Sequence, residues 1–347
     1  MKWPRRRYLV AIGVAVIVVA AIVVGVVLLT GKNGGTTTST VIPGQSTPDE
    51  QRPVTDKVWP ATLALHVAID ASTQADQPAD VAILDGKLYL VDTGHGRLLQ
   101  VSADGKDFKV LDGQVDPKLA LSAPMAITSD QSQLYVADSG AGQLVLVAPS
   151  GKVNRTITLA KGSSADALPP RPLGIVVWAD GSFAVSDGNN HRLLKYSADG
   201  SLLWSVGTGT PSTGENGLNA PSGIALDKAG NVYVVDALNS QVKKYSPDGK
   251  FLLGFGQLGD QAGQFSRAKS VAVDDAGNIY VSDGLQAAVQ VFDQTGAYVG
   301  FVGRKDPADP KSDSLFQAPH GVRIIGGKLY VVDRYNGLFV FDLPASK

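Results

Sequence analysis

The hydrophobic pattern divides the chain into three parts. Residues 9–29, LVAIGVAVIVVAAIVVGVVLL, form one uninterrupted apolar run. Residues 31–57 are rich in Gly, Thr, Ser and Pro and show no apolar periodicity. From residue 58 onward, short apolar runs alternate with turn-forming motifs such as AGN and PDG. The pattern therefore predicts one membrane-spanning helix, a flexible linker and an all-β domain.

The apolar run is long enough to cross a membrane, because a helix of about 20 residues spans a hydrocarbon core of about 30 Å. Basic residues cluster before it, whereas only Lys32 follows closely. The preceding basic residues are Lys2, Arg5, Arg6 and Arg7. This bias predicts a cytoplasmic segment at residues 1–8, a transmembrane signal-anchor at residues 9–30, and a propeller outside the cell membrane. A cleaved signal peptide and a twin-arginine export signal, suggested by RRRYLV, remain alternatives.

One unit is repeated six times in residues 58–347. Its clearest copies occupy residues 171–207, 220–256 and 267–303, and looser copies begin at Ala79, Ala123 and Ala318. The aspartate that closes the second strand of each copy recurs every 46 to 50 residues. These aspartates are Asp92, Asp138, Asp187, Asp236, Asp283 and Asp333. Each copy contains four short β-type runs, for example GIAL, NVYVVD, QVKKYS and FLLGFG, which predicts a six-bladed β-propeller.

The pattern within the copies resembles the NHL repeat. It reads P-x-G-I-A-x-D, then G-N-x-Y-V-x-D, then N-x-x-x-K-Y, and it ends with F-G. Trp-Asp dipeptides are absent and Gly-Gly pairs are rare, which disfavours the WD40 and kelch classes. The resemblance implies an NHL-like six-bladed propeller, here in a membrane-anchored form of bacterial type.

The sixth copy ends after its third strand, so its fourth strand must come from elsewhere. An open edge would leave unpaired backbone N–H and C=O groups. Residues 61–70, ATLALHVAID, precede the first copy and have strand composition. We therefore expect this segment to close the ring beside residues 337–342.

Composition narrows the function. The chain has no cysteine, which excludes disulfides and cysteine-based zinc sites. The formal net charge is −1, so no basic surface is expected for nucleic acid. Nearly all the carboxylates are aspartates. We interpret the six repeated aspartates as structural residues that accept hydrogen bonds from backbone N–H groups in the turn after their strand.

Binding is expected on the face that carries the long connections between blades, because long loops on a rigid scaffold usually carry function. The candidate binding residues on or near this face are Arg267, Lys269, His320, Arg334, Tyr335 and His191. With Arg304 and Lys305 nearby, the basic residues suggest an anion-binding patch. Asp306, Asp309 and Asp313 could instead hold Ca²⁺ through oxygen ligands.

His320 is expected where the innermost strand of the sixth blade begins, near the axis. Aligned by sequence, its counterparts in the other blades are apolar or small. They are Val81, Met125, Leu173, Ser222 and Ser270. The four histidines, His66, His95, His191 and His320, do not occupy equivalent positions, so a histidine-based metal site is not expected. No cofactor is predicted, although an axial divalent metal or Ca²⁺ remains an alternative.

These observations favour a binding module over an enzyme. A tethered NHL propeller resembles the sensor ends of certain bacterial receptor kinases. We therefore predict a membrane-tethered extracytoplasmic propeller that acts as a ligand-binding, protein-binding or scaffolding module. Its expected partners are the membrane, through residues 9–30, and an extracytoplasmic protein or polysaccharide. The alternative, implied by related propellers, is a lactonase or lyase with an axial metal site.

Overall fold

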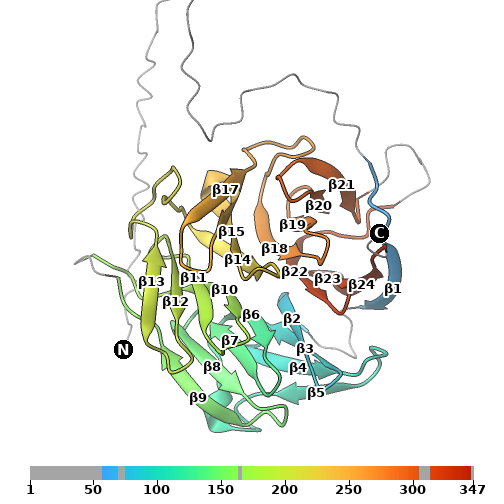
Figure 1. The fold of residues 1–347 in the computed structure, drawn as a ribbon. Helices are drawn as coiled ribbons and strands as arrows, with labels where there is room; N and C mark the ends of the chain where they lie inside the picture. The colour runs from blue at the N-terminus through green and yellow to red at the C-terminus, as the bar shows by residue number, and fades with distance from the viewer. Residues whose placement is uncertain (1–56, 69–74, 163–165, 305–312, 345–347) are drawn as a thin grey trace, which may run out of the picture. The chain divides into compact units, whose positions relative to one another are not determined.

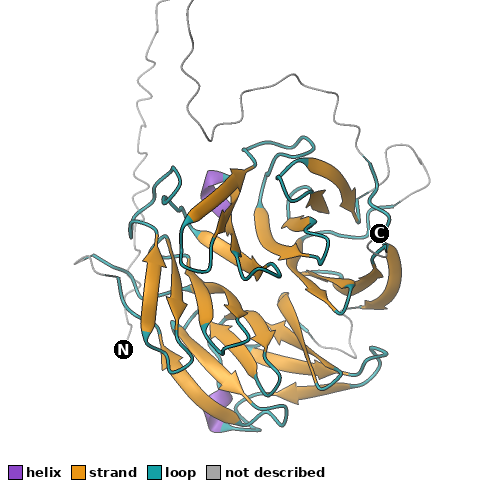
Figure 2. Cartoon of the chain, in the orientation of Figure 1, coloured by secondary structure: helices purple, strands orange, loops and turns teal. Residues whose placement is uncertain are grey.

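The computed structural model describes residues 57–68, 75–162, 166–304 and 313–344. Apart from two single turns of 3₁₀ helix, the regular structure in these residues is β-strand (Figure 2). None of the described residues forms a helix that is long and apolar enough to cross a membrane. The predicted span at residues 9–30, the segment before it and the linker up to residue 56 lie outside the described residues.

Six four-stranded antiparallel sheets surround a central axis, which confirms the predicted propeller (Figure 1). Blade 1 contains β2 (Pro78–Leu84), β3 (Lys87–Asp92), β4 (Arg97–Val101) and β5 (Phe108–Leu111). Blade 2 contains β6 (Pro124–Ser129), β7 (Leu134–Asp138), β8 (Gln143–Val147) and β9 (Val153–Thr158). Blade 3 contains β10 (Pro172–Val177), β11 (Phe183–Asp187), β12 (Arg192–Tyr196) and β13 (Leu202–Val206). The helical turn η1 (Pro117–Leu119) connects blades 1 and 2.

Blade 4 contains β14 (Pro221–Leu226), β15 (Val232–Asp236), β16 (Gln241–Tyr245) and β17 (Phe251–Phe255). Its second helical turn, η2 (Ala237–Asn239), follows β15. Blade 5 contains β18 (Ala268–Val273), β19 (Ile279–Asp283), β20 (Ala288–Phe292) and β21 (Tyr298–Val302). Blade 6 contains β22 (Pro319–Ile325), β23 (Lys328–Asp333), β24 (Gly337–Asp342) and β1 (Thr62–Val67). The first strands β2, β6, β10, β14, β18 and β22 contact one another in turn around the axis (Figure 1).

The ring is closed by β1, as the sequence predicts. β1 pairs antiparallel with β24, with Thr62 opposite Asp342 and Val67 opposite Leu338. His66, on this strand, bonds through Nε2 to the Asn336 carbonyl at 2.7 Å and stacks on Phe339. All strands of the six sheets therefore lie within the compact unit Arg52–Lys347. Residues 52–347 carry every backbone pairing of the propeller and form a self-contained fragment for experiment.

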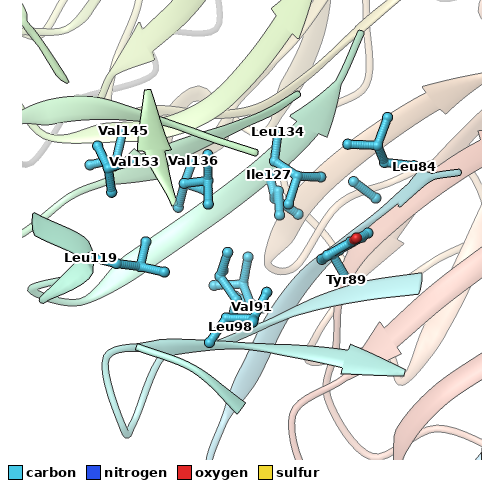
Figure 3. Packing of buried hydrophobic residues seen from close by; sticks show 14 residues of the cluster. Leu84, Tyr89, Val91, Leu98, Leu119, Ile127, Leu134, Val136, Val145 and Val153 are labelled. Carbon is cyan, nitrogen blue, oxygen red and sulfur yellow. The ribbon is translucent and has the colours of Figure 1, made fainter. Parts of the chain in front are cut away.

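The core consists of six apolar clusters, one between each pair of neighbouring blades. Between blades 1 and 2, Tyr89 and Val91 of β3 pack with Ile127 of β6 and with Leu134 and Val136 of β7 (Figure 3). Because each strand alternates its side chains between its two faces, every blade contributes to the cluster on either side. This arrangement holds the loops at the ends of the strands on a rigid frame.

The two ends of the propeller differ in their connections. We call the end where the second strands finish at the repeated aspartates the loop face, because the connections between blades also lie there. The opposite end, with the tight turns between first and second strands, is the turn face. A channel of about 260 Å³ lined by the first strands lies toward the turn face. Arg323 crosses it and pairs with Asp80, with Nε 3.0 Å from Oδ1.

Candidate functional site

The six repeated aspartates hold backbone segments together, and their hydrogen bonds extend beyond the turn that the sequence predicts. Each is fully buried and accepts a hydrogen bond from the segment that leads into the first strand of its own blade. The donors are the backbone N–H groups of Asp76, Ser122, Arg171, Asn219, Arg267 and Gln317. Among the hydrogen bonds of the described residues, those from backbone N–H groups of the following turn reach only Asp187, Asp283 and Asp333. The aspartates therefore fasten the connection between blades to the end of the second strand.

Strand pairing corrects the sequence alignment of the axial ring. In every blade the first residue of the first strand lies opposite the repeated aspartate, for example Pro319 opposite Asp333 and Ala268 opposite Asp283. The residue after it is the counterpart of His320. These residues are Ala79, Met125, Leu173, Ser222, Lys269 and His320. The assignments of Val81 and Ser270 were wrong, because blade 5 lacks the proline that marks this position and Pro78 precedes the recognisable part of blade 1.

The corrected ring places Lys269 and His320 side by side at the axial end of the loop face. Arg267 lies two residues before Lys269, and Arg334 follows the repeated aspartate of blade 6. The electrostatic fields of Arg267 and Arg334 both act on Lys269 and on His320. The structure thus brings together four of the six sequence-predicted binding residues.

Arg171 joins this group and was missed by sequence reasoning. It precedes the first strand of blade 3, as Arg267 does in blade 5, and its charge acts on Lys269. The other blades have Gln77, Ala123, Ala220 and Ala318 at this position. An alignment of that position across the repeats would have shown the two arginines. We call Arg171, Arg267, Lys269 and Arg334 the cationic cluster.

The pKa values in this region show that burial and neighbouring cations disfavour the protonated forms of these side chains. Burial, together with Arg267 and Arg334, lowers the pKa of Lys269 to about 8. Burial is also the largest cause that lowers the pKa of Arg334. Burial and the nearby Arg334 lower the pKa of His320 to about 3, so this histidine is neutral at physiological pH. Because its Nδ1 lies 3.0 Å from the Ala79 carbonyl oxygen, Nδ1 carries the proton and Nε2 is left as an acceptor.

Few groups in the protein neutralise the positive charge of the cationic cluster or accept its hydrogen bonds. Within the described residues, none of its four members forms a salt bridge. Arg334 donates from Nη1 to Gln77 at 3.2 Å, but its Nε is buried without a hydrogen-bond partner. Asp283, a carboxylate whose charge acts on Lys269, is fully buried and accepts backbone N–H bonds from Ser266 and Leu285. The arrangement can bind an anion, because an anion would supply the missing partners.

The remaining predicted residues lie in different settings. Tyr335 is exposed beside Arg334. The Nδ1 of His191 accepts a hydrogen bond from the Ala220 N–H at 3.0 Å, which ties blade 3 to blade 4. The guanidinium of Arg304 stacks on the Phe301 ring. Lys305 and the predicted calcium ligands Asp306 and Asp309 lie outside the described residues, whereas Asp313 is described and exposed.

A divalent metal does not fit the residues at the axis. Among the described residues, no three His, Asp or Glu side chains are grouped closely enough to hold a metal ion. Cations surround His320 and would repel a second positive charge. The described residues therefore offer no grouped ligands for the axial metal that the sequence left as an alternative.

Comparisons with known proteins agree with the predicted class. The family model described as NHL repeat matches residues 218–245, which include β14 to β16. A gluconolactonase from Xanthomonas campestris has a similar structure, with a TM-score of 0.58 at 16% identity over 84% of this chain and 99% of that one. A virginiamycin B lyase from Staphylococcus aureus, in a catalytically inactive form with quinupristin, gives 0.55 at 12% identity over 82% and 100%. The comparison with curated proteins gives no match.

A structure described as a streptogramin B lyase has a TM-score of 0.57 at 13% identity, over 83% of this chain and 100% of that one. At these identities the likeness concerns the fold. Together with the repeat match, it confirms the prediction of an NHL-repeat six-bladed propeller.

Proposed function

We propose that this NHL-repeat propeller is a binding module that recognises an anionic group at the axial end of its loop face. The observation that carries the proposal is the cationic cluster, in which the pKa of Lys269 is lowered to about 8 and Arg334 Nε is buried without a partner. Such an arrangement destabilises the unliganded fold, and residues that act against stability are characteristic of functional sites. A carboxylate, sulfate or phosphate group would neutralise the cluster and complete its hydrogen bonds.

The proposal includes the location of the module. The apolar run at residues 9–30 and the basic residues before it support a membrane anchor, with the propeller held outside the cytoplasm by the linker at residues 31–57. In this arrangement the loop face meets ligands of the cell envelope, which include carboxylate-bearing proteins and polysaccharides.

A lactonase or lyase is the second candidate, because solved structures with those activities share the fold. Among the described residues, no three His, Asp or Glu side chains are grouped closely enough to hold the axial metal of the enzyme hypothesis. Hydrolysis of gluconolactone by residues 52–347 in the presence of divalent metal would favour the enzyme over the binding module.

Anion recognition is tested by thermal unfolding of residues 52–347 in citrate, sulfate or chloride at equal ionic strength. At a ligand concentration of about 100 times Kd, binding stabilises the fold by about 2.7 kcal/mol, which raises Tm by roughly 5–10 °C. We expect this saturable rise for citrate or sulfate, and its loss in the double variant Lys269→Gln/Arg334→Gln. The control is Lys87→Gln, which removes one charge from an exposed site on the turn face. Equal stabilisation of the double variant and the wild type would refute the proposal.

A further inference from the structure

A second feature of the loop face is a set of exposed apolar side chains beside the cationic cluster. Leu238, Leu285 and Tyr335 are 69%, 66% and 61% exposed. Each stands two residues after the repeated aspartate, in blades 4, 5 and 6 respectively. Because the repeat places this position alike in every blade, the three side chains form an arc along one half of the loop face.

At the position two residues after the aspartate, large apolar residues occur only in these three consecutive blades, and a fourth residue comes from the connection between two of them. Leu258, in the connection from blade 4 to blade 5, is 75% exposed. Blades 1, 2 and 3 have Gly94, Gly140 and Asn189 at the position two residues after the aspartate. We call Leu238, Leu258, Leu285 and Tyr335 the apolar arc. Single exposed leucines are common, but a repeated position that is apolar in only three adjacent blades indicates an interaction surface.

Three of these side chains are presented on fixed backbone. The Leu238 N–H donates to the Asn219 carbonyl at 3.0 Å. The N–H groups of Leu285 and Tyr335 donate to Oδ1 of the repeated aspartates of their blades, at 3.0 and 2.9 Å. The loops are therefore held in place before binding, so a partner would lose little free energy in ordering them.

We propose that the apolar arc and the cationic cluster together bind an acidic segment of another protein that also carries apolar side chains. This inference rests on the proposed anion site and names its partner class. One carboxylate of the segment would enter at Lys269 and Arg334, and its apolar side chains would cover Leu285 and Tyr335. The cations favour an acidic partner by charge complementarity, and the exposed leucines account for the apolar part of the contact.

The partial burial of Lys269 and Arg334 favours a protein segment over a membrane surface. Lys269 and Arg334 are partly buried at the axis, whereas the apolar arc is more than half exposed. An anion that pairs with Lys269 and Arg334 must therefore enter below the exposed surface. A carboxylate on a projecting side chain can do so, whereas lipid phosphates lie in a broad plane that would meet the exposed side chains first.

The test uses residues 52–347 and an array of 12-residue peptides that contain Asp, Glu and Leu, each matched by a copy with Asn and Gln in place of the acids. Binding of the strongest peptide is measured by fluorescence anisotropy. We expect the triple variant Leu238→Ser/Leu285→Ser/Tyr335→Ser to weaken peptide binding at least tenfold while citrate stabilisation stays unchanged. Lys269→Gln should weaken both. The control, Leu252→Ser, alters an exposed leucine on the outer strand of blade 4 and should change neither.

The outcomes separate the two proposals. If citrate does not stabilise the wild-type fragment, the anion site is refuted, and the acidic partner that rests on it is refuted as well. If citrate stabilises the wild type, three outcomes would refute the acidic protein partner alone. These outcomes are that no peptide binds, that the neutral copies bind as well as the acidic ones, or that the triple variant binds peptide like the wild type. Arc-dependent binding to vesicles of phosphatidylglycerol, without peptide binding, would also overturn the protein partner. Unchanged Tm of the triple variant verifies that it folds.

Discussion

Two lysine–aspartate pairs in blade 4 have nearly equal distances but opposite exposure, and their comparison tests what burial does to an ion pair. Lys243 Nζ lies 2.8 Å from Asp236 Oδ2, with side chains 2% and 0% exposed. Lys250 Nζ lies 3.0 Å from Asp248 Oδ2, with side chains 80% and 60% exposed. Because the distances match, a difference in response to substitution reports the surroundings of the pair.

Asp236→Ala is expected to be strongly destabilising. The change leaves the Lys243 ammonium buried with only the carbonyl oxygens of Gly214 and Gly217 as acceptors. It also removes the acceptor of the Asn219 N–H, at 2.6 Å. Leaving one charge of a buried pair uncompensated costs about 3–5 kcal/mol. At about 2–4 °C per kcal/mol for a large domain, Tm should fall by roughly 6–20 °C.

The assay is thermal unfolding of residues 52–347, followed by circular dichroism and tryptophan fluorescence. Lys250→Ala is the exposed control and should leave Tm unchanged within error, because solvent screens that pair. The double variant Asp236→Ala/Lys243→Met should be more stable than Asp236→Ala, because no buried charge remains. A Tm for Asp236→Ala no lower than that for Lys250→Ala would contradict the effect of burial, and so would a double variant that is less stable than Asp236→Ala.

The remaining expectations concern the cationic cluster, the closing strand and the anchor. Because the pKa of Lys269 is about 8, citrate binding should weaken about tenfold from pH 7 to pH 9 as its ammonium deprotonates; a Kd that is flat over this range, measured by calorimetry, would contradict this. The pKa of Lys269 in the folded state lies below the ordinary 10.5, so the charge of this lysine destabilises the fold below about pH 8. Lys269→Met should therefore raise Tm at pH 7 in chloride. This advantage should disappear above pH 10.5, where the lysine is neutral in both the folded and the unfolded state. Deletion of Thr62–Val67 should abolish cooperative unfolding, because β24 would be left with an open edge; unchanged melting would show that blade 6 does not need β1. Full-length chain should stay with membranes in alkaline carbonate, and removal of residues 9–30 should release it; retention of the truncated chain would contradict the anchor.

The repeat made the architecture predictable from the sequence. The regular spacing of the aspartates gave the number of blades, and the missing fourth strand of blade 6 required a partner that only residues 61–70 could supply. Both inferences depend on local pattern and on the need to pair a strand edge. That is why the pairing of Thr62 with Asp342 could be expected although the two residues are far apart in the chain.

The site was harder to predict, because its side chains come from different blades and meet near the axis. Arg171 and Arg334 belong to different blades, and no spacing in the sequence indicates that both lie near Lys269. The position of Lys269 itself was misjudged because Ala268 replaces the proline that marks the start of the first strand in the other blades. Burial, which lowers the pKa of Lys269 and His320, depends on the packed ring and cannot be read from composition.

Closure of the ring by β1 also sets the order in which the domain can mature. Thr62 is synthesised first among the residues of blade 6, yet its partner Asp342 is nearly the last residue of the described chain. At a synthesis rate of about 5–20 residues per second, β1 waits roughly 15–55 seconds before β24 exists. Blades 1 to 5 can form during that interval, whereas blade 6 can form only after residues 337–342 have been synthesised. A ribosome that stops before residue 337 therefore releases a chain in which β1 and β23 both have an unpaired edge, which makes such truncated copies natural substrates for chaperones and proteases.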